Sequence, residues 1–116
     1  MVNLSLSLPY PPSINHYYVR CRNHVAIGKA GREYRAAVAQ SYSAIEGKPL
    51  TCRLKIEVSV FPPDKRRRDI DNVLKALLDA MQHAGVYADD AQIVDLHITK
   101  KPPRKGGYVW ITIEEA

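Results

Sequence analysis

The chain has 116 residues, which is enough for one domain with a single hydrophobic core. Hydrophobic residues make up 46% of it and charged residues 25%, which argues against a disordered chain, and no apolar run reaches the roughly 18–20 residues that a membrane span needs. The 17 Lys and Arg residues outnumber the 12 Asp and Glu residues, and the resulting net charge of +5 bears on the protein's partners rather than on its fold.

The amino-terminal residues and the two cysteines predict a soluble protein of the cytoplasm. Residues 1–8 lack the basic start and the continuous apolar stretch of a signal peptide. Cys21 and Cys52 are too far apart for a CxxC pair, and two cysteines do not make a disulfide-dense scaffold. In a reducing compartment we expect both to be free thiols rather than a single bridge.

The first half of the chain predicts a strand, an irregular segment and a helix. Residues 2–8 alternate apolar and polar side chains, which is typical of a half-buried strand, and the proline-rich stretch at 9–13 ends it. Residues 14–27 show no clean period and predict irregular structure or short strands. Residues 29–46 contain no proline and space their apolar side chains three and four apart, which predicts an amphipathic helix ended by Gly47.

The middle of the chain predicts a strand followed by a second helix. Residues 52–60 show the cleanest alternation, and Phe61-Pro62-Pro63 ends this strand. Gly85 fits the carboxyl-terminal cap of the helix. One apolar helical face precedes it, at steps of three and one: Ile70, Val73, Leu74, Leu77, Leu78 and Met81.

The last part of the chain predicts two more strands and completes the fold class. The first alternates inward-facing Val94, Leu96 and Ile98 with polar residues, and the second covers residues 108–113. The loop at 101–107 is rich in Pro, Gly and basic residues and predicts a hairpin-like connection. This order predicts one α+β domain over residues 1–116, a mixed β-sheet with two helices packed on one face.

The charged residues gather in a few places. One basic block spans Lys65–Arg68, and a second comprises Lys100, Lys101, Arg104 and Lys105. Asp69, Asp71, Asp89 and Asp90 lie beside these blocks or between them. Carboxylates within a basic surface suggest a metal-dependent enzyme that acts on a polyanion, although charge alone favours solvated, locally paired surface residues.

Asp69 and Asp71 flank Ile70 directly after four cations. In an extended chain residues i and i+2 point the same way, so both carboxylates would face one site while Ile70 faces the core. On a continuous helix they would point about 200° apart, so we expect the helix to begin here. The alternative is that one aspartate is an N-cap, but a cap needs only one.

Lys75 and the Asp89-Asp90 pair are further candidates. Lys75 lies four residues beyond Asp71, and this spacing alone favours a surface ion pair over a cation that contacts phosphate. Asp89 or Asp90 either starts a turn or supplies a third oxygen ligand. Mg²⁺ prefers carboxylate and water oxygens, and three carboxylates are enough to hold one or two such ions. A bound ion would polarise a phosphoryl oxygen and acidify a bound water.

These segments resemble the RusA family of Holliday-junction resolvases, which are small dimeric endonucleases. The Arg-rich Asp-x-Asp-Asn and Asp-Asp-Ala-Gln sequences are specific in combination. The similar segments run in order through the chain: 8–13, Asn15 with Tyr17 and Tyr18, 63–72 with Lys75, 85–95 and 101–107.

The resemblance implies three aspartate ligands for Mg²⁺, with Mn²⁺ as a substitute, and a lysine needed for cleavage. By position these are Asp69, Asp71 and Asp90 for the metal and Lys75 as a further catalytic residue, with Asp89 the next candidate for the third ligand. The expected DNA-binding residues are all basic: Lys65, Arg66, Arg67, Arg68, Arg104 and Lys105.

We therefore expect a Mg²⁺-dependent, structure-selective endodeoxyribonuclease that resolves four-way junctions by paired phosphodiester hydrolysis in DNA recombination and repair. Because a four-way junction is nearly two-fold symmetric, paired incisions suit a homodimer with one site per subunit. One alternative is a non-catalytic DNA- or RNA-binding module in which the aspartates are structural. Another is a nuclease that cuts flaps or replication forks.

Overall fold

The fold is built on a four-stranded mixed sheet. The computed structural model describes residues 3–42 and 48–116. The strands of the sheet are β1 (Asn3–Pro9), β4 (Leu54–Phe61), β5 (Ile93–Lys100) and β6 (Tyr108–Glu115), in the order β1-β6-β4-β5. β6 is antiparallel to both β1 and β4, whereas β5 is parallel to β4.

The alternation seen in the sequence puts one apolar face of the sheet against the helices. Ile111 pairs with Leu6 on one side and Val58 on the other, so inward side chains line up across three strands. The buried residues of these strands occupy alternate positions: Leu6, Leu8, Leu54, Ile56, Val58, Val60, Val109, Ile111 and Ile113.

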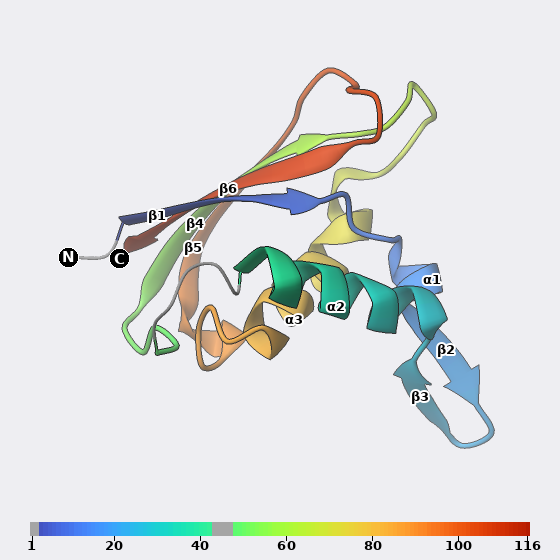
Figure 1. The fold of residues 1–116 in the computed structure, drawn as a ribbon, viewed down its shortest axis with the longest axis horizontal. Coiled ribbons are helices and arrows are strands. Elements are labelled where there is room, and N and C mark those ends of the chain that lie inside the picture. The colour runs from blue at the N-terminus through green and yellow to red at the C-terminus, as the bar shows by residue number, and fades with distance from the viewer. Residues whose placement is uncertain (1–2, 43–47) are drawn as a thin grey trace.

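Helices α2 (Lys29–Tyr42) and α3 (Leu74–His83) cover that face of the sheet (Figure 1). Their buried residues lie three or four apart, as the amphipathic pattern predicts: Tyr34, Val38 and Tyr42 in α2, and Ala76, Leu77, Ala80 and Met81 in α3. The predicted α+β domain with two helices on one face is therefore confirmed. The expected end of the first helix at Gly47 lies outside the described residues.

The segment without a clear period forms a short helix and a hairpin. Helix α1 (Ile14–Tyr17) leads into β2 (Tyr18–Cys21), which pairs with β3 (His24–Ile27), and this hairpin stands away from the sheet (Figure 1). Cys21 and Cys52 are free thiols, as predicted. Within the described ranges, no helix combines the length and the apolar character required to cross a membrane.

The loop at 101–107 is not a hairpin, because β4 lies between β5 and β6. The loop instead passes over the end of β4. The Lys101 N–H donates to the Val60 carbonyl at 2.7 Å, and the Arg104 N–H donates to the Pro62 carbonyl at 2.8 Å. The prediction was wrong because two alternating strands joined by a turn-rich loop do not reveal which strand pairs with which.

Two residues predicted to face the core are exposed. Val94 is 48% exposed because the register of β5 against β4 shifts by one residue there, so Ile93 packs against the core instead. Ile70 is 37% exposed because it opens a 3₁₀ turn, η1 (Ile70–Val73), rather than α3 itself, and Val73 is the buried residue of that turn.

Gly85 ends α3 as predicted. Its φ of +85° is in the left-handed region, which glycine adopts without a steric cost. The Gly85 N–H donates to Gln82 at 3.0 Å and the Val86 N–H donates to Met81 at 3.0 Å, which together close the helix in a Schellman motif.

Candidate metal and nucleic-acid site

Asp69 and Asp71 lie at the amino-terminal entry to α3. Asp69 occupies the N-cap of η1 with an extended backbone (ψ 138°), so the helix begins where the sequence predicts. The Asp69 side chain accepts no capping hydrogen bond, and only its backbone carbonyl binds the Asn72 N–H, at 3.1 Å. The N-cap explanation therefore does not account for the Asp69 carboxylate.

Asp89 and Asp90 have different surroundings. The Asp89 carboxylate accepts the Ala91 N–H at 2.8 Å, and Gln92 Oε1 accepts the Asp89 N–H at 2.8 Å. This reciprocal capping box starts the 3₁₀ turn η2 (Asp90–Gln92). Asp89 is thus the cap, and the carboxylate of Asp90 has no part in it.

Two glutamines that the sequence reasoning missed hold the Asp90 turn in place. Gln92 Nε2 donates to the carbonyls of Leu50 at 2.9 Å and Cys52 at 2.8 Å, which attaches the turn to the segment before β4. Gln82, in the last turn of α3, accepts the Asp90 N–H at 2.9 Å. The Asp-x-x-Gln spacing of a capping box is visible in the sequence and is a usable signal for Gln92.

The partners of the seven aspartates divide them into two groups. Four of them have hydrogen-bond or ion-pair partners: Asp64 with Arg66 and Arg68, Asp79 with Tyr17 and Arg35, Asp89 with Ala91, and Asp95 with His97. Asp69, Asp71 and Asp90 have no such partner among residues 3–42 and 48–116. The aspartates left free in the described ranges are therefore the three predicted metal ligands.

Free carboxylates suit Mg²⁺, which usually takes one or two of them and completes its octahedron with water and phosphate oxygens. Asp69 and Asp71 are exposed and share one turn, so they fit such an ion as a pair. However, no three carboxylate, His or Cys side chains of the described ranges lie close enough to hold a metal ion together. The structure therefore does not bring Asp90 into one cluster with the Asp69–Asp71 pair.

Lys75 is exposed on α3 and forms no ion pair with Asp71. Asp79 lies one turn further along α3. Burial would raise the pKa of that carboxyl, but hydrogen bonds from Tyr17 and Arg35 outweigh it and lower the pKa, and the charge of Lys75 adds to the lowering. Burial and the bond to Asp79 raise the pKa of Tyr17 to about 12. The network joins α1, α2 and α3 beside Lys75.

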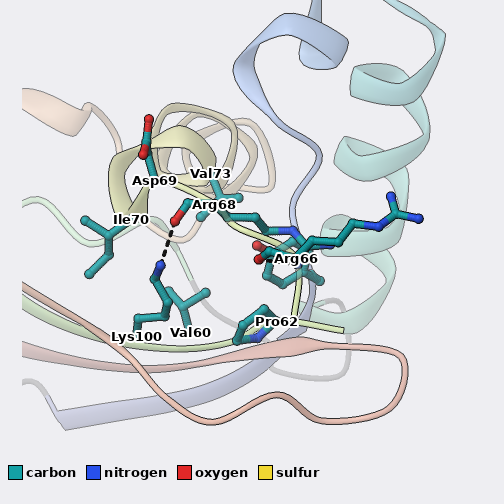
Figure 2. A pocket seen from close by; sticks show the side chains of 9 residues that line it. Val60, Pro62, Arg66, Arg68, Asp69, Ile70, Val73 and Lys100 are labelled. Atoms are coloured by element: carbon teal, nitrogen blue, oxygen red, sulfur yellow. Dashed lines mark hydrogen bonds between the residues drawn. The ribbon is translucent and has the colours of Figure 1, made fainter. Parts of the chain in front are cut away.

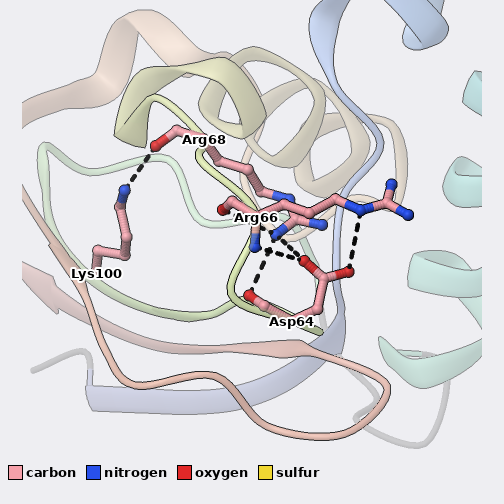
Figure 3. A network of polar contacts seen from close by, with 4 residues as sticks. All are labelled: Asp64, Arg66, Arg68 and Lys100. Atoms are coloured by element: carbon pink, nitrogen blue, oxygen red, sulfur yellow. Dashed lines mark hydrogen bonds and ion pairs between the residues drawn. The ribbon is translucent and has the colours of Figure 1, made fainter.

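The basic block at 65–68 contains side chains of two kinds. Arg68 Nη1 donates to Asp64 at 2.7 Å (Figure 3). The Arg68 guanidinium lies over the ring of Tyr10, 5.8 Å from its centroid. The hydrogen bond from Arg68 and one from the Arg66 N–H lower the pKa of Asp64 to about 2. The side chain of Arg68 is 22% exposed and that of Arg66 is 84% exposed. Arg66 is therefore open to a ligand, whereas Arg68 is bound internally.

A small pocket lies between this block and the end of the sheet. Figure 2 shows Asp69 and Ile70 on one side of it and Lys100 and Val60 on the other. Lys100 Nζ donates to the Arg68 carbonyl at 2.6 Å, which fixes the basic block against β5.

The crossing loop brings the second basic block to the first. Its bond to Pro62 sets Arg104 beside the start of the 65–68 block, and the Arg104 guanidinium lies over Phe61 at 5.8 Å. Lys105 is exposed next to it. The two segments that carry the predicted DNA-binding residues thus lie together at one end of the sheet, near Asp69.

Comparisons with known proteins place the chain beside a family of DNA endonucleases. A family model described as Endodeoxyribonuclease RusA matches residues 9–114. The chain is 41% identical over 116 residues to the crossover junction endodeoxyribonuclease RusA of Escherichia coli strain K12, an alignment that covers 99% of this chain and 97% of that protein. It is 43% identical over 114 residues to the enzyme of that name from Enterobacteria phage 82, with 95% and 92% covered.

Proposed function

The chain belongs to the RusA family of endodeoxyribonucleases, and from this premise we propose that it is a crossover junction endodeoxyribonuclease that cuts four-way DNA junctions in recombination and repair. The observation that carries the proposal is that Asp69, Asp71 and Asp90 are the three aspartates without a hydrogen-bond or ion-pair partner in the described chain. Unpaired carboxylates beside a basic surface repel a polyanion. A bound divalent cation would offset this repulsion and link the carboxylates to a phosphate.

Mg²⁺, or Mn²⁺ in its place, is the proposed cofactor. When bound, such an ion makes water a better nucleophile and stabilises charge on the phosphate. Asp69 and Asp71 would hold the ion from the entry to α3, and Asp90 would contribute a third carboxylate. Lys75 offers a positive charge to the phosphate or to the leaving oxygen.

The DNA backbone is held by the exposed cations at the same end of the sheet. Lys65, Arg66 and Arg67 contact phosphates, with Arg104 and Lys105 beside them. Arg68 has an indirect role. Its hydrogen bonds to Asp64 fix the loop that carries Lys65, Arg66 and Arg67.

The working form is a homodimer in the cytoplasm, bound to branched DNA. A four-way junction has approximate two-fold symmetry, so a symmetric dimer carries one site for each of two paired incisions.

The test compares two neighbouring aspartates. We expect Asp90→Asn to lower Mg²⁺-dependent junction cleavage by at least about 100-fold, because it removes a charged metal ligand. Binding of the junction in EDTA should be equal or tighter, since one negative charge is gone. Cleavage is followed on a synthetic mobile four-way junction and on a linear duplex, with Mg²⁺ or EDTA.

Asp89→Asn is the matched control, because asparagine caps a helical turn as well as aspartate does. It removes the same charge one residue away and should cleave normally. If Asp90→Asn cleaves normally while Asp89→Asn does not, the third ligand is Asp89. If Asp69→Asn and Asp71→Asn also cleave normally, the protein is a binding module rather than a metal nuclease.

A further inference from the structure

The hairpin of β2 and β3 carries a positive charge that nothing in its surroundings neutralises. Residues 1–32 contain four Lys and Arg residues and no acidic residue, because the first one in the chain is Glu33. Glu33 forms an exposed ion pair with Lys29 at 3.8 Å. Arg20 and Arg22 are both exposed on the hairpin and have no hydrogen-bond or ion-pair partner among residues 3–42 and 48–116. Both guanidinium groups are therefore open to a ligand.

The outer part of the hairpin takes no part in the hydrophobic core. Residues 19–25 include no buried side chain, so core packing does not explain them. Arg20 pairs with Val25 across the two strands, and Val25 is 61% exposed. The tip is hollowed by a groove of about 250 Å³, lined by Arg20, Arg22, Asn23, His24 and Val25. Cations beside an apolar side chain suit the backbone of a nucleic acid, in which phosphates alternate with sugars.

The base of the hairpin is fixed to the helices. The Gly28 N–H donates to the Tyr17 carbonyl at 2.9 Å, and Arg32 Nη1 donates to the Ile27 carbonyl at 2.9 Å. Tyr17 is itself buried, and its hydroxyl donates to Asp79 of α3. A ligand at the tip thus meets groups that are positioned before it binds, which lowers the entropic cost of binding.

The hairpin lies on the same side of the molecule as the loop that precedes α3 (Figure 1). Tyr10 lines the pocket of Asp69, and α1 begins four residues later, at Ile14. Each strand of the hairpin has four residues, so the hairpin extends about 13 Å from the end of α1 at roughly 3.3 Å per residue. Phosphates of one DNA strand follow each other every 3.4 Å or so along the helix axis, so this length matches about four base pairs.

We propose that the hairpin is a second DNA-binding element, which contacts the sugar–phosphate backbone of a duplex arm outside the crossover. Arg20 and Arg22 bind phosphates of that arm, and Val25 lies against its sugars. The contact with DNA then continues about four base pairs beyond the surface formed by the two basic blocks. A second copy of this chain fits the hairpin less well, because the chain has a net charge of +5. This inference rests on the proposed function, which supplies the branched DNA.

The double variant Arg20→Ala/Arg22→Ala tests the contact. Neither side chain has a partner in the described chain, so the variant should fold as wild type does, with the same circular dichroism spectrum. In EDTA it should bind a long-armed four-way junction about tenfold more weakly, or worse, at about 0.1 M salt. The slope of log affinity against log salt should flatten by about one to two units, since two phosphate contacts are lost.

Two further variants separate this contact from overall charge and from shape. Lys48→Ala/Arg53→Ala removes the same charge before β4 and should bind nearly as wild type does. Arg20→Lys/Arg22→Lys keeps both charges on the hairpin and should recover most of the affinity and of the salt slope.

Hydroxyl-radical footprinting of the bound junction locates the contact on the DNA. Wild type should protect an arm about four nucleotides further from the crossover than Arg20→Ala/Arg22→Ala does. Protection at the crossover itself should be the same for both proteins, because the two basic blocks remain in place.

The outcomes separate this inference from the proposed function. If Arg20→Ala/Arg22→Ala binds and protects the junction as wild type does, the hairpin is no DNA contact, while the nuclease assignment stands. Equal losses for Lys48→Ala/Arg53→Ala would also overturn the inference, as would a variant that sediments at half the mass of wild type, because the hairpin would then join two copies of the chain. If wild type neither binds nor cuts four-way junctions with Mg²⁺, the proposed function itself fails.

Discussion

At the scale of single residues, Asp79 is the carboxylate on which three helices converge. Tyr17 from α1 and Arg35 from α2 both donate to its Oδ2, Arg35 at 2.7 and 3.1 Å. The side chains of Arg35 and Asp79 are each about one quarter exposed, at 26% and 25%. A hydrogen-bonded ion pair in such a half-buried place contributes more than an exposed pair does.

Asp79→Asn should lower stability at pH 7 by about 1–3 kcal/mol, because Arg35 and Tyr17 lose a charged acceptor. The folded state lowers the pKa of Asp79 below its ordinary 3.8. Its contribution is therefore fully present above that value and is lost as the pH falls through the folded pKa. Urea unfolding between pH 2 and pH 7 should show a shallower acid loss for the variant than for wild type.

Asp95→Asn is the control, because the Asp95–His97 pair is exposed and should contribute less than about 1 kcal/mol. Coincident curves for Asp79→Asn and wild type would show that the network does not stabilise the fold.

The residues of the site differ in how far the sequence could predict them. Spacing alone predicted that the helix begins beside Asp69 and Asp71, and the structure confirms this start. It left Asp89 and Asp90 equivalent, and only the hydrogen bonds of the capping box separate them. No local sequence pattern predicts the Asp79 network, because Tyr17, Arg35 and Asp79 lie in three different helices. The metal and DNA roles of these residues stay predictions.

At the scale of elements, the loop that crosses from β5 to β6 depends on two glycines with different surroundings. Gly106 and Gly107 both have left-handed backbones, with φ of +83° and +65°. A Cβ on Gly106 would meet nothing within 4 Å, whereas one on Gly107 would lie 3.0 Å from Pro63 and 3.1 Å from Tyr10. The close approach at Gly107 holds the loop against the start of the basic block.

Gly106→Ala should lower stability by about 1–2 kcal/mol, which is the cost of a left-handed backbone for alanine. Gly107→Ala should cost more by at least about 1 kcal/mol, because the backbone of Pro63 cannot move aside as a flexible side chain would. Urea unfolding of the two variants gives the difference. Equal losses would mean that the loop is not packed as closely as the structure has it.

The elements themselves were largely predictable, whereas their pairing was not. Alternation predicted the four strands of the sheet, and the bounds of β4 differ from the prediction by about two residues. No local pattern shows that β6 pairs with β1 and β4 while β5 lies outside, because that choice depends on contacts between distant parts of the chain. The register shift at Val94 also depends on pairing with β4, and it turns Val94 outward where alternation predicted an inward-facing side chain.

At the scale of the whole molecule, the exposed cations are not evenly distributed. Lys65, Arg66 and Arg67 meet Arg104 and Lys105 at the end of the sheet that carries Asp69. Lys48 and Arg53 are also exposed, but they lie before the first residue of β4, at the opposite end of that strand from the 65–68 block. Net charge alone would make these groups equivalent for DNA binding, and their positions make them different.

Replacing Arg66 and Arg67 together by alanine should weaken junction binding in EDTA and flatten its dependence on salt. Two lost phosphate contacts reduce the slope of log affinity against log salt by about one to two units. Fluorescence anisotropy at several salt concentrations measures the slope. The variant Lys48→Ala/Arg53→Ala removes the same charge elsewhere and should leave the slope nearly unchanged. Equal effects of the two double variants would mean that overall charge, not this surface, attracts the DNA.

The position of β6 also governs when this fold can form during synthesis. Among residues 3–42 and 48–116, β1 pairs with β6 and with no other strand, and β6 is the last strand of the sheet along the chain. A nascent chain that has emerged only as far as β5 therefore has β1 unpaired, and β4 lacks its antiparallel neighbour. Contacts between such distant segments form slowly, and exposed strand edges favour aggregation in the meantime. The ribosome must release the residues of β6 before the sheet closes, so a polypeptide that stops short of them has no complete scaffold on which a nuclease site can assemble.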